Sequence, residues 1–529
     1  LIIQKGMETV RRFQDWAGPA VWVAMLVLAV GLTIKAGGFS MEHGIPMDVL
    51  LDKTKDAGVN GQPGSFWALT AVGATWITYF AALYLNFCDF SRYAKDRAAV
   101  TRGNLWGLPV DLIAFSLVAG VTTISAYHVY GEVLLHPEQI SAKFEENLLD
   151  ATNDYHLIID EPSELAGIPD DVLAMMQAAA EADGQTGWKI TLQMPSYLPV
   201  MQYADSRELR QILYRAYVTR ASEFGKPELD NTPLIAQILR LRREAAELLG
   251  FRSYAEVSLE AKMADTPAEV LKFLDELAVR ARPYAEKDFE ELKAFARTEL
   301  GYDTLEAWDN AYVSEKLRVA RYSFSDQEVK QYFPEPRVLA GLFKLIETLY
   351  GLHIREDQAP VWHPDVKFYT LTDHAGQRVG QFYLDLYARA SKRGGAWMDD
   401  VITRRRKAEG VQTPVAYLNC NFSAPVGGKP ALFTHDEVIT LFHETGHGLH
   451  HLLTQVEELG VSGINGVEWD AVELPSQFME NFCWEWDVLK HMTGHVDTGA
   501  ALPKDLFDKM LAARNFQSGL QTLRQIEFA

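Results

Sequence analysis

Two patterns of hydrophobic residues divide the chain. Within the first 136 positions, three long runs contain no charged residue, at 16–34, 57–88 and 112–131. Each is close to the roughly 20 apolar residues that cross a bilayer as a helix, and Trp or Tyr residues lie near their ends, as interfacial aromatics do. We therefore predict three transmembrane helices in residues 1–136. The alternative, buried helices of a large soluble protein, is disfavoured because three such runs occur in so short a stretch.

After residue 136 the apolar residues recur at helical spacing. This periodicity predicts amphipathic helices over 206–221, 234–249 and 338–350, and another that begins at Thr266. The last starts with Thr266-Pro267-Ala268-Glu269, a capping-box sequence with Pro at the first helical position. No fixed-period repeat is present, so we expect an irregular helical domain.

Between residues 366 and 422 the spacing changes to that of strands. Residues 366–372 and 378–387 flank a turn at 373–376 and predict a hairpin, and residues 414–422 predict one more strand. The predicted fold class is therefore mainly α, with a small β-sheet beside the helix that follows.

That helix contains the strongest chemical motif of the chain. Thr434 and Glu437 form a second capping-box sequence, and the centre of the helix reads His443-Glu444-Thr445-Gly446-His447. Residues four apart share a helix face, so both imidazoles can bind one tetrahedral Zn²⁺ while Glu444 lies beside them. Zinc lowers the pKa of a bound water toward about 7 and polarises the scissile carbonyl, and Glu444 can serve as general base. The alternative is a pair of surface histidines.

A third zinc ligand is required, because a catalytic zinc takes three protein ligands and keeps one position for water. We place His450 and His451 on the helix surface or behind the ligands. No further histidine follows at the spacing of the metzincin pattern, so a carboxylate from a following helix is expected. The candidates are Glu457, Glu458, Glu468, Glu473, Glu480 and Glu485. Glu473 ranks slightly ahead because Pro475 suits the first turn of a helix that can pack on the first. Glu480 is the reserve, or a hydrogen-bond partner of a ligating histidine.

Composition and charge exclude several classes of function. The chain has 529 residues, 48% of them hydrophobic, which excludes a small binding module and a disordered chain. The 50 basic and 71 acidic residues give a net charge of −21, which argues against nucleic acid as a partner. Cys88, Cys420 and Cys483 are too scattered to form a disulfide framework or a cysteine metal site.

From about residue 143 to the end, the sequence resembles the oligopeptidase A branch of the thimet-oligopeptidase-type zinc peptidases. Five segments carry the resemblance in order, at 143–157, 194–222, 382–400, 414–438 and 433–485. The resemblance implies that His443, His447 and Glu473 are the zinc ligands and that Glu444 is the general base. It also implies a zincin-type fold with two mostly helical halves flanking a deep channel, and short unstructured peptides as substrates.

The chain also departs from the pattern of the family that it resembles. The family has a further helical portion at the N-terminus and continues past Ala529 into a loop whose Tyr and His stabilise the oxyanion, so we expect a catalytic region truncated at both ends. Loss of one oxyanion donor typically costs about 10²–10³-fold in rate. The family commonly has Phe where this chain has Thr445, a difference that we expect to be tolerated.

The first part of the chain resembles a different family. The element Asn86 to Tyr93, within residues 79–112, and the stretch 6–23 are similar to the nucleobase:cation symporters. Those transporters have about a dozen spans with the substrate site between two repeats, so three spans imply a membrane fold without a transport site. Basic residues beside the spans place the chain after Gly131 outside, whereas the peptidase family is cytoplasmic. We predict membrane attachment through the N-terminal segment alone.

These observations predict two domains and three functional interpretations. Residues 1–136 are a symporter-like transmembrane fragment, and residues 137–529 are a zinc oligopeptidase catalytic region. The leading hypothesis is a zinc-dependent metalloendopeptidase that hydrolyses short oligopeptides with one Zn²⁺ per chain. The alternatives are a symporter fragment and a non-functional hybrid of two gene fragments.

Overall fold

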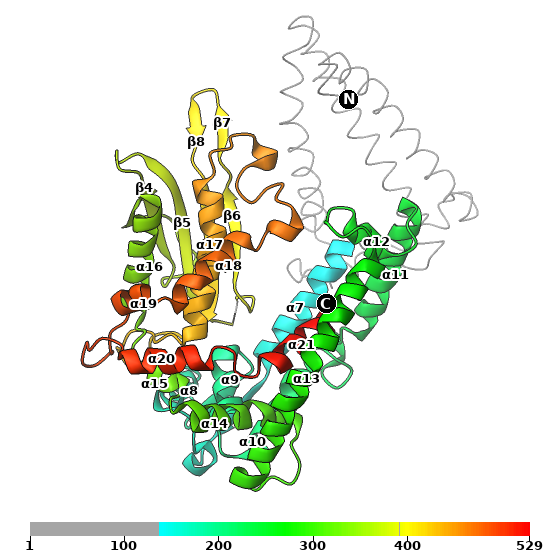
Figure 1. The fold of residues 1–529 in the computed structure, drawn as a ribbon, viewed down its shortest axis with the longest axis vertical. Coiled ribbons are helices and arrows are strands. Elements are labelled where there is room, and N and C mark those ends of the chain that lie inside the picture. The colour runs from blue at the N-terminus through cyan, green and yellow to red at the C-terminus, as the bar shows by residue number, and fades with distance from the viewer. Residues whose placement is uncertain (1–136, 391) are drawn as a thin grey trace, which may run out of the picture. The chain divides into compact units, whose positions relative to one another are not determined.

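A computed structural model describes residues 137–390 and 392–529. The three predicted transmembrane runs lie outside the described residues. Pro137–Ala529 forms one compact unit and is shown in colour in Figure 1. Within the part that the structure describes, no helix combines the length and the apolar character needed to cross a membrane.

The unit is mainly helical, as predicted. The helices are α7 (Pro137–Asp154), α8 (Asp170–Ala182), α9 (Met194–Tyr203), α10 (Arg207–Val218), α11 (Thr232–Leu249), α12 (Tyr254–Leu259), α13 (Pro267–Leu300), α14 (Asn310–Tyr322), α15 (Asp326–Lys330), α16 (Glu335–Tyr350), α17 (His435–Leu453), α18 (Leu474–Glu480), α19 (Trp486–Met492), α20 (Lys504–Ala513) and α21 (Ser518–Phe528). The strands are β1 (His156–Ile159), β2 (Trp188–Thr191), β3 (His353–Asp357), β4 (Lys367–Thr372), β5 (Arg378–Tyr387), β6 (Trp397–Ile402), β7 (Arg405–Lys407), β8 (Gly410–Gln412) and β9 (Val415–Phe422).

The helices predicted from periodicity form as α10, α11, α13 and α16. At the start of α13, the Thr266 hydroxyl accepts a hydrogen bond from the Glu269 N–H at 3.2 Å, as the capping sequence predicts. The Glu269 carboxylate, however, accepts from the N–H of Asp265 rather than from that of Thr266. The predicted box is therefore formed on one side only.

The main sheet has five strands in the order β3-β4-β5-β9-β6. The predicted hairpin β4–β5 and the predicted strand β9 are confirmed, and β9 pairs in parallel with β5. The sequence pattern missed the two edge strands, β3 and β6. Both carry charged side chains, as edge strands commonly do, and alternation of apolar residues is therefore weak in them.

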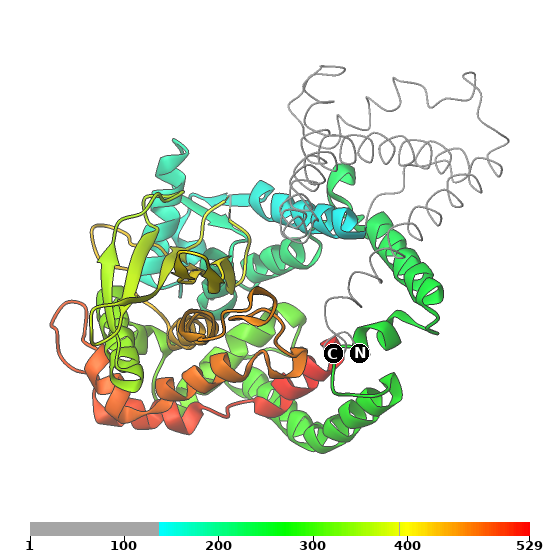
Figure 2. The ribbon, with the colours of Figure 1, turned by 90° about the horizontal axis from the view of Figure 1, so that it is seen from above.

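Helices α16 and α17 cover one face of this sheet (Figures 1 and 2). Phe343 of α16 contacts the rings of Tyr369 and Phe382 edge to face, and Gly448 of α17 lies against Leu418. This core fixes the orientation of α17, the helix with the His-Glu-Thr-Gly-His motif, relative to β9.

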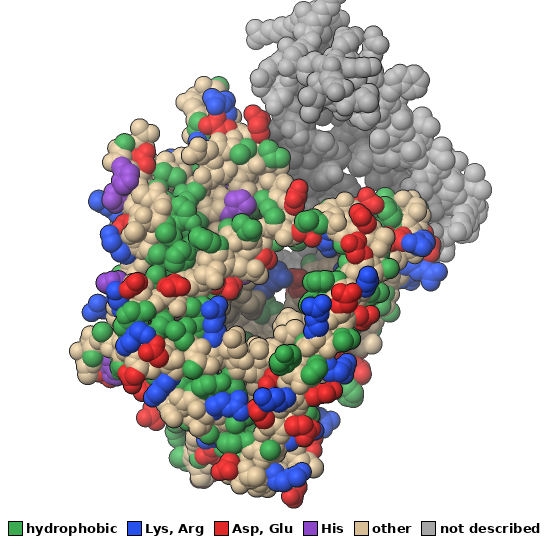
Figure 3. Space-filling model, in the orientation of Figure 1, with side chains coloured by type: hydrophobic (Ala, Val, Ile, Leu, Met, Phe, Trp, Pro, Cys, Tyr) green, Lys and Arg blue, Asp and Glu red, His purple; other side chains and the backbone are tan. Residues whose placement is uncertain are grey.

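A second core lies in the helical part, where α8 and α9 pack against the antiparallel pair of strands β1 and β2. Helix α21 packs closely on α13, because a Cβ on Gly519 would lie 2.6 Å from the Ala285 nitrogen. Figure 3 shows a hollow between the surface over α17 and α18 and the surface over α13, with charged side chains visible in it.

Candidate metal centre

Helix α17 begins with a complete capping box. The Thr434 hydroxyl accepts from the Glu437 N–H at 3.1 Å, and the Glu437 carboxylate accepts from the Thr434 N–H at 2.7 Å. The apolar stripe of the helix is buried, as predicted. His443 and His447 therefore lie on its other side, with 26% and 16% of their side chains exposed. A partly exposed pair of imidazoles one turn apart can bind a ligand that comes from solvent.

A glycine brings the next helix into backbone contact with α17. A Cβ on Gly446 would lie 2.4 Å from the Pro475 carbonyl oxygen and 2.6 Å from the Ser476 Cα. Only glycine permits this approach, which places Glu473, the residue before α18, over the two histidines. The Ser476 hydroxyl donates to the Glu473 Oε2 at 2.7 Å and orients the carboxylate.

Three side chains converge to form a possible metal site. The Nε2 atoms of His443 and His447 each lie 3.2 Å from the Oε2 of Glu473. Ligand atoms about 2.0–2.1 Å from a tetrahedral zinc lie about 3.3 Å from one another, so the observed separations fit such an ion. The structure thus brings together the three residues predicted from sequence, and this donor set could hold a metal ion.

Glu480, the reserve candidate, has a different position. Its Oε1 lies 2.6 Å from the Nδ1 of His443. An ionised carboxylate only accepts hydrogen bonds, so Nδ1 carries the proton and the lone pair of Nε2 is available to a metal. Among the other candidates, Glu457 pairs with Arg404 and Arg406. Glu458, Glu468 and Glu485 are not members of the trio.

Glu444 lies beside the trio with 5% of its surface exposed. Its Oε2 is buried and has no hydrogen-bond partner among the described residues. Burial raises the pKa of Glu444 to about 7, the carboxylate of Glu473 adds to the rise, and His443 opposes it. A carboxyl group of this kind can both accept and release a proton near neutral pH.

The two following histidines lie outside the trio, as predicted. His451 is fully buried rather than on the surface. Its Nε2 lies 3.0 Å from the Ile402 carbonyl oxygen of β6, and the backbone at Gly463 packs against its Nδ1. His450 is half-buried, and burial lowers its pKa. The loop after α17 covers the face of the helix that holds His451, and the spacing of apolar residues in a helix does not predict such a contact.

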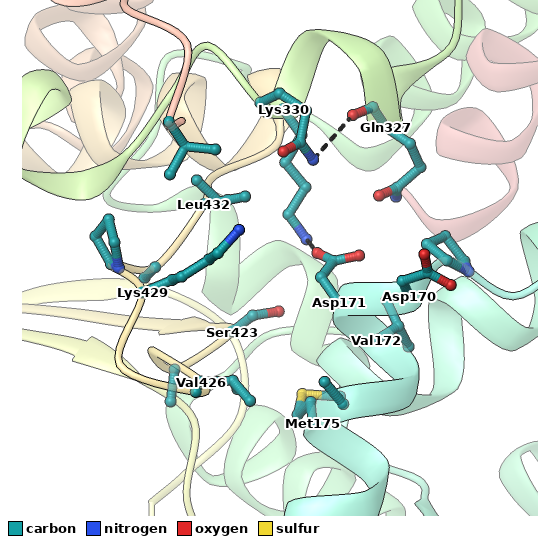
Figure 4. Close-up of a pocket in the computed structure, with 18 residues that line it drawn as sticks. Asp170, Asp171, Val172, Met175, Gln327, Lys330, Ser423, Val426, Lys429 and Leu432 are labelled. Carbon is teal, nitrogen blue, oxygen red and sulfur yellow. Dashed lines mark hydrogen bonds and ion pairs between the residues drawn. The ribbon is translucent and has the colours of Figure 1, made fainter. Parts of the chain in front are cut away.

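Sequence reasoning also missed two cavities, neither of which is lined by the trio. The larger, about 570 Å³, lies near the start of α17 between α8, α15 and the loop 423–432. Figure 4 shows Lys330 reaching toward Asp171, with Lys429 and Ser423 on the loop side of the cavity. Lys330 is 5% exposed, and its Nζ lies 2.7 Å from the Asp171 Oδ2. This ion pair, in which Lys330 is buried and Asp171 is partly exposed, ties α15 to α8.

Comparison with known proteins gives two family matches. A family model described as Peptidase family M3 matches residues 200–529, and one described as a permease for cytosine/purines, uracil, thiamine and allantoin matches residues 1–157. Both resemblances drawn from the sequence are thereby confirmed.

Individual relatives agree with the first match. The oligopeptidase A of Salmonella typhimurium is 54% identical over 459 residues, which are 86% of this chain and 67% of that protein. The oligopeptidase A of Escherichia coli gives the same values. The dipeptidyl carboxypeptidase of Escherichia coli is 33% identical over 385 residues, 72% of this chain and 56% of that protein.

Proposed function

Since the chain belongs to peptidase family M3, we propose that it is a zinc-dependent metalloendopeptidase that hydrolyses short oligopeptides. The observation that carries this proposal is the convergence of two imidazole nitrogens and one carboxylate oxygen beside the buried Glu444. The names of the relatives at 54% identity support oligopeptides as the substrate class.

In this proposal His443, His447 and Glu473 hold the zinc through Nε2, Nε2 and Oε2. When bound, zinc lowers the pKa of a water and polarises the peptide carbonyl. Glu444 receives the proton of the attacking water on Oε2, the oxygen without a partner, and delivers it to the nitrogen of the leaving amine. Its raised pKa supports this role, because a group that titrates near neutrality performs both transfers readily.

Two further groups would hold the ligands in place. Glu480 accepts from the Nδ1 of His443 and so keeps Nε2 directed at the metal. Ser476 donates to the ligating oxygen of Glu473 and limits rotation of that carboxylate. Both contacts support a site that is already arranged for an ion.

A separate proposal concerns residues 1–136. We propose that they form a symporter-like transmembrane domain that attaches the catalytic region 137–529 to a membrane. The three uncharged runs and the permease family match support this. If the full chain, extracted from cells with carbonate at high pH, leaves the membrane pellet, the attachment is excluded.

Cleavage of a quenched fluorescent oligopeptide by the full chain tests the peptidase proposal. We expect one zinc per chain, loss of turnover with a chelator, and its return with added zinc. Glu444→Gln should retain zinc and lose turnover, whereas Glu458→Gln, an exposed carboxamide substitution just after the same helix, should change neither. Chelator-resistant cleavage would exclude the zinc mechanism, and full turnover in Glu444→Gln would exclude Glu444 as the base.

A further inference from the structure

A long stretch of helix in the described part of the chain contains few buried residues. It consists of α12, the turn that follows it and the first half of α13, residues 254–284, and we call it the arm (Figure 1). Among the described residues of α12 none is buried, and the buried residues of α13, Ala285, Leu292 and Ala296, all lie beyond the arm. A segment with so few buried contacts opens locally at a small cost in free energy. The position of the arm therefore depends on the contacts that its exposed end makes.

The segment that carries Glu473 is also exposed, but it is fastened at both ends. At its start, the Asn465 Nδ2 donates to the Thr403 hydroxyl at 3.3 Å. At its end, Ser476 is fully buried. We call the residues between Asn465 and Ser476 the ligand segment. Residues 468–471 and Glu473 itself are exposed within it, so a contact in the middle of the segment can decide how firmly Glu473 is held.

A hydrogen bond joins the middle of the ligand segment to the arm. The Asp470 Oδ2 accepts from the Met263 N–H at 2.9 Å, across 207 positions of the chain. Met263 lies in the turn between α12 and α13 and is 78% exposed. Asp470 lies in a short 3₁₀ helix that ends two residues before Glu473. The contact thus links the weakly packed arm to the backbone that positions the third member of the trio.

The turn that donates this hydrogen bond is itself held to the helices on either side. The Thr266 hydroxyl caps α13 by accepting from the Glu269 N–H, and the Lys262 Nζ donates to the Ser258 hydroxyl of α12 at 2.7 Å. A hydrogen bond with an ionised acceptor is also stronger than one between neutral groups. A displacement of the arm is therefore transmitted to Asp470 rather than absorbed within the turn.

The arm also lies where its position affects access to the trio. Helix α13 borders the hollow that Figure 3 shows beside the surface over α17 and α18. Coupling between a binding site and a second element is reciprocal, because the two share one free energy of interaction. If the arm steadies Glu473, a metal ion that fixes Glu473 must steady the arm to the same extent.

We propose that the Asp470–Met263 hydrogen bond couples the arm to the metal site, so that a zinc ion held by the trio also holds the arm in place beside the hollow. This inference rests on the proposed function for the identity of the metal. Asp470 is not a member of the trio and acts through Glu473, so it is a positioning residue. Zinc binding would thus fix both the ligands and one wall of the space through which a peptide approaches them.

Hydrogen–deuterium exchange of the full chain, without and with zinc, measures this coupling without any turnover. We expect zinc to slow exchange about three- to tenfold in fragments that cover residues 260–266, which is the range that one hydrogen bond supplies. Fragments from β1 and β2, in the second core, should not change. Zinc affinity is measured in the same samples by competition with a chromogenic chelator.

Variants assign the effect to the two partners of the hydrogen bond. Asp470→Leu should abolish the slowing by zinc and weaken zinc binding about three- to tenfold, whereas Asp470→Asn, which keeps an acceptor oxygen, should retain part of both effects. Glu468→Gln removes an exposed carboxylate of the same segment and should change neither. Met263→Pro removes the donor and should add nothing to Asp470→Leu, whereas Met263→Ala keeps the N–H and should behave as the unchanged chain.

The outcomes separate this inference from the peptidase proposal. Zinc binding with no change of exchange at residues 260–266 would overturn the coupling and leave the proposed function intact, as would slowing that persists in Asp470→Leu. Additive effects of Asp470→Leu and Met263→Pro on zinc affinity would overturn the assignment to this hydrogen bond. Failure of the unchanged chain to bind zinc would overturn both proposals.

Discussion

Substitution of Gly446 by alanine is the most direct test of how the candidate metal site is assembled. The added Cβ would lie 2.4 Å from the Pro475 carbonyl oxygen, whereas ordinary contact begins at 3.4 Å. The obstructing atoms are backbone, at the start of α18, and cannot rotate away. Helix α18 must therefore move by about 1 Å relative to α17, and it carries Glu473 with it.

The expected cost follows from the geometry of the trio. The Glu473 oxygen lies 3.2 Å from both ligating nitrogens, and metal–ligand distances tolerate changes of only about 0.2 Å. A displacement of about 1 Å detaches this ligand or distorts the site. Misplacement on this scale costs about 100-fold in rate. We therefore expect Gly446→Ala to reduce kcat/KM about 100-fold and to weaken zinc binding in competition with a chromogenic chelator.

The same helix provides a matched control. A Cβ on Gly448 would lie 2.8 Å from the Cδ2 of Leu418, the end of a flexible side chain that can change rotamer. Gly448→Ala should thus retain zinc affinity and activity far better than Gly446→Ala. Alanine in a helix interior is by itself favourable by about 0.8–1.0 kcal/mol over glycine. If Gly446→Ala raised stability in urea and kept the zinc affinity of the control, the contact between the two helices would not position Glu473.

Three other substitutions test separate contacts. Glu480→Gln removes the negative charge next to the Nδ1 of His443 and should weaken zinc binding about 10- to 100-fold. Most of the turnover should return at saturating zinc. Unchanged zinc affinity would contradict the role of Glu480 in positioning His443. Burial lowers the pKa of His435, so below about pH 6.5 the unfolded chain binds a proton that the folded chain does not bind. The free energy of unfolding measured in urea should therefore fall as the pH decreases from 7.5 to 5.5. His435→Gln should reduce this dependence of stability on pH. Asp385, which is 2% exposed, accepts hydrogen bonds from Arg389 and Lys392. Asp385→Asn leaves these two cations without their shared carboxylate and should cost about 3–5 kcal/mol in the free energy of unfolding. A loss below about 1 kcal/mol would show that these three residues do not form a buried ion network.

The sequence predicted those parts of the candidate site that depend on local spacing. The cap at Thr434, the buried stripe of α17 and the pair His443 and His447 all follow from helical periodicity, and each is present. The choice between Glu473 and Glu480 stayed nearly open at that level, because both fit a following helix. The structure separates them through the contact at Gly446, which brings the start of α18 rather than its end over the histidines.

The hydrophobic pattern of the sequence does not predict features that depend on segments far apart in the chain. Strand β6 contains Asp399 and Asp400 and lies beside β9 at the edge of the described sheet, so it lacks the apolar alternation of a central strand. His451 was expected on the helix surface or behind the ligands, and the sequence pattern did not show that the loop with Gly463 and the end of β6 would enclose it. The cavity of about 460 Å³ is likewise lined by residues from α7, from the end of α10 and its following residues, and from the β5–β6 loop, which are far apart in the chain.

The electrostatics of the trio indicate why such an arrangement persists in a folded chain. Glu473 and Glu480 lie against the histidines, and Glu444 is buried beside them, so three carboxylates gather around two imidazoles. Burial and the charge of Glu473 both raise the pKa of Glu444, which means that the ionised form is disfavoured in the absence of a compensating cation. A divalent cation bound by the trio would offset the repulsion among these three carboxylates, and its binding free energy would add to the stability of the folded chain. The groups that oppose folding of the empty site are thus the groups that would favour its occupation by a metal.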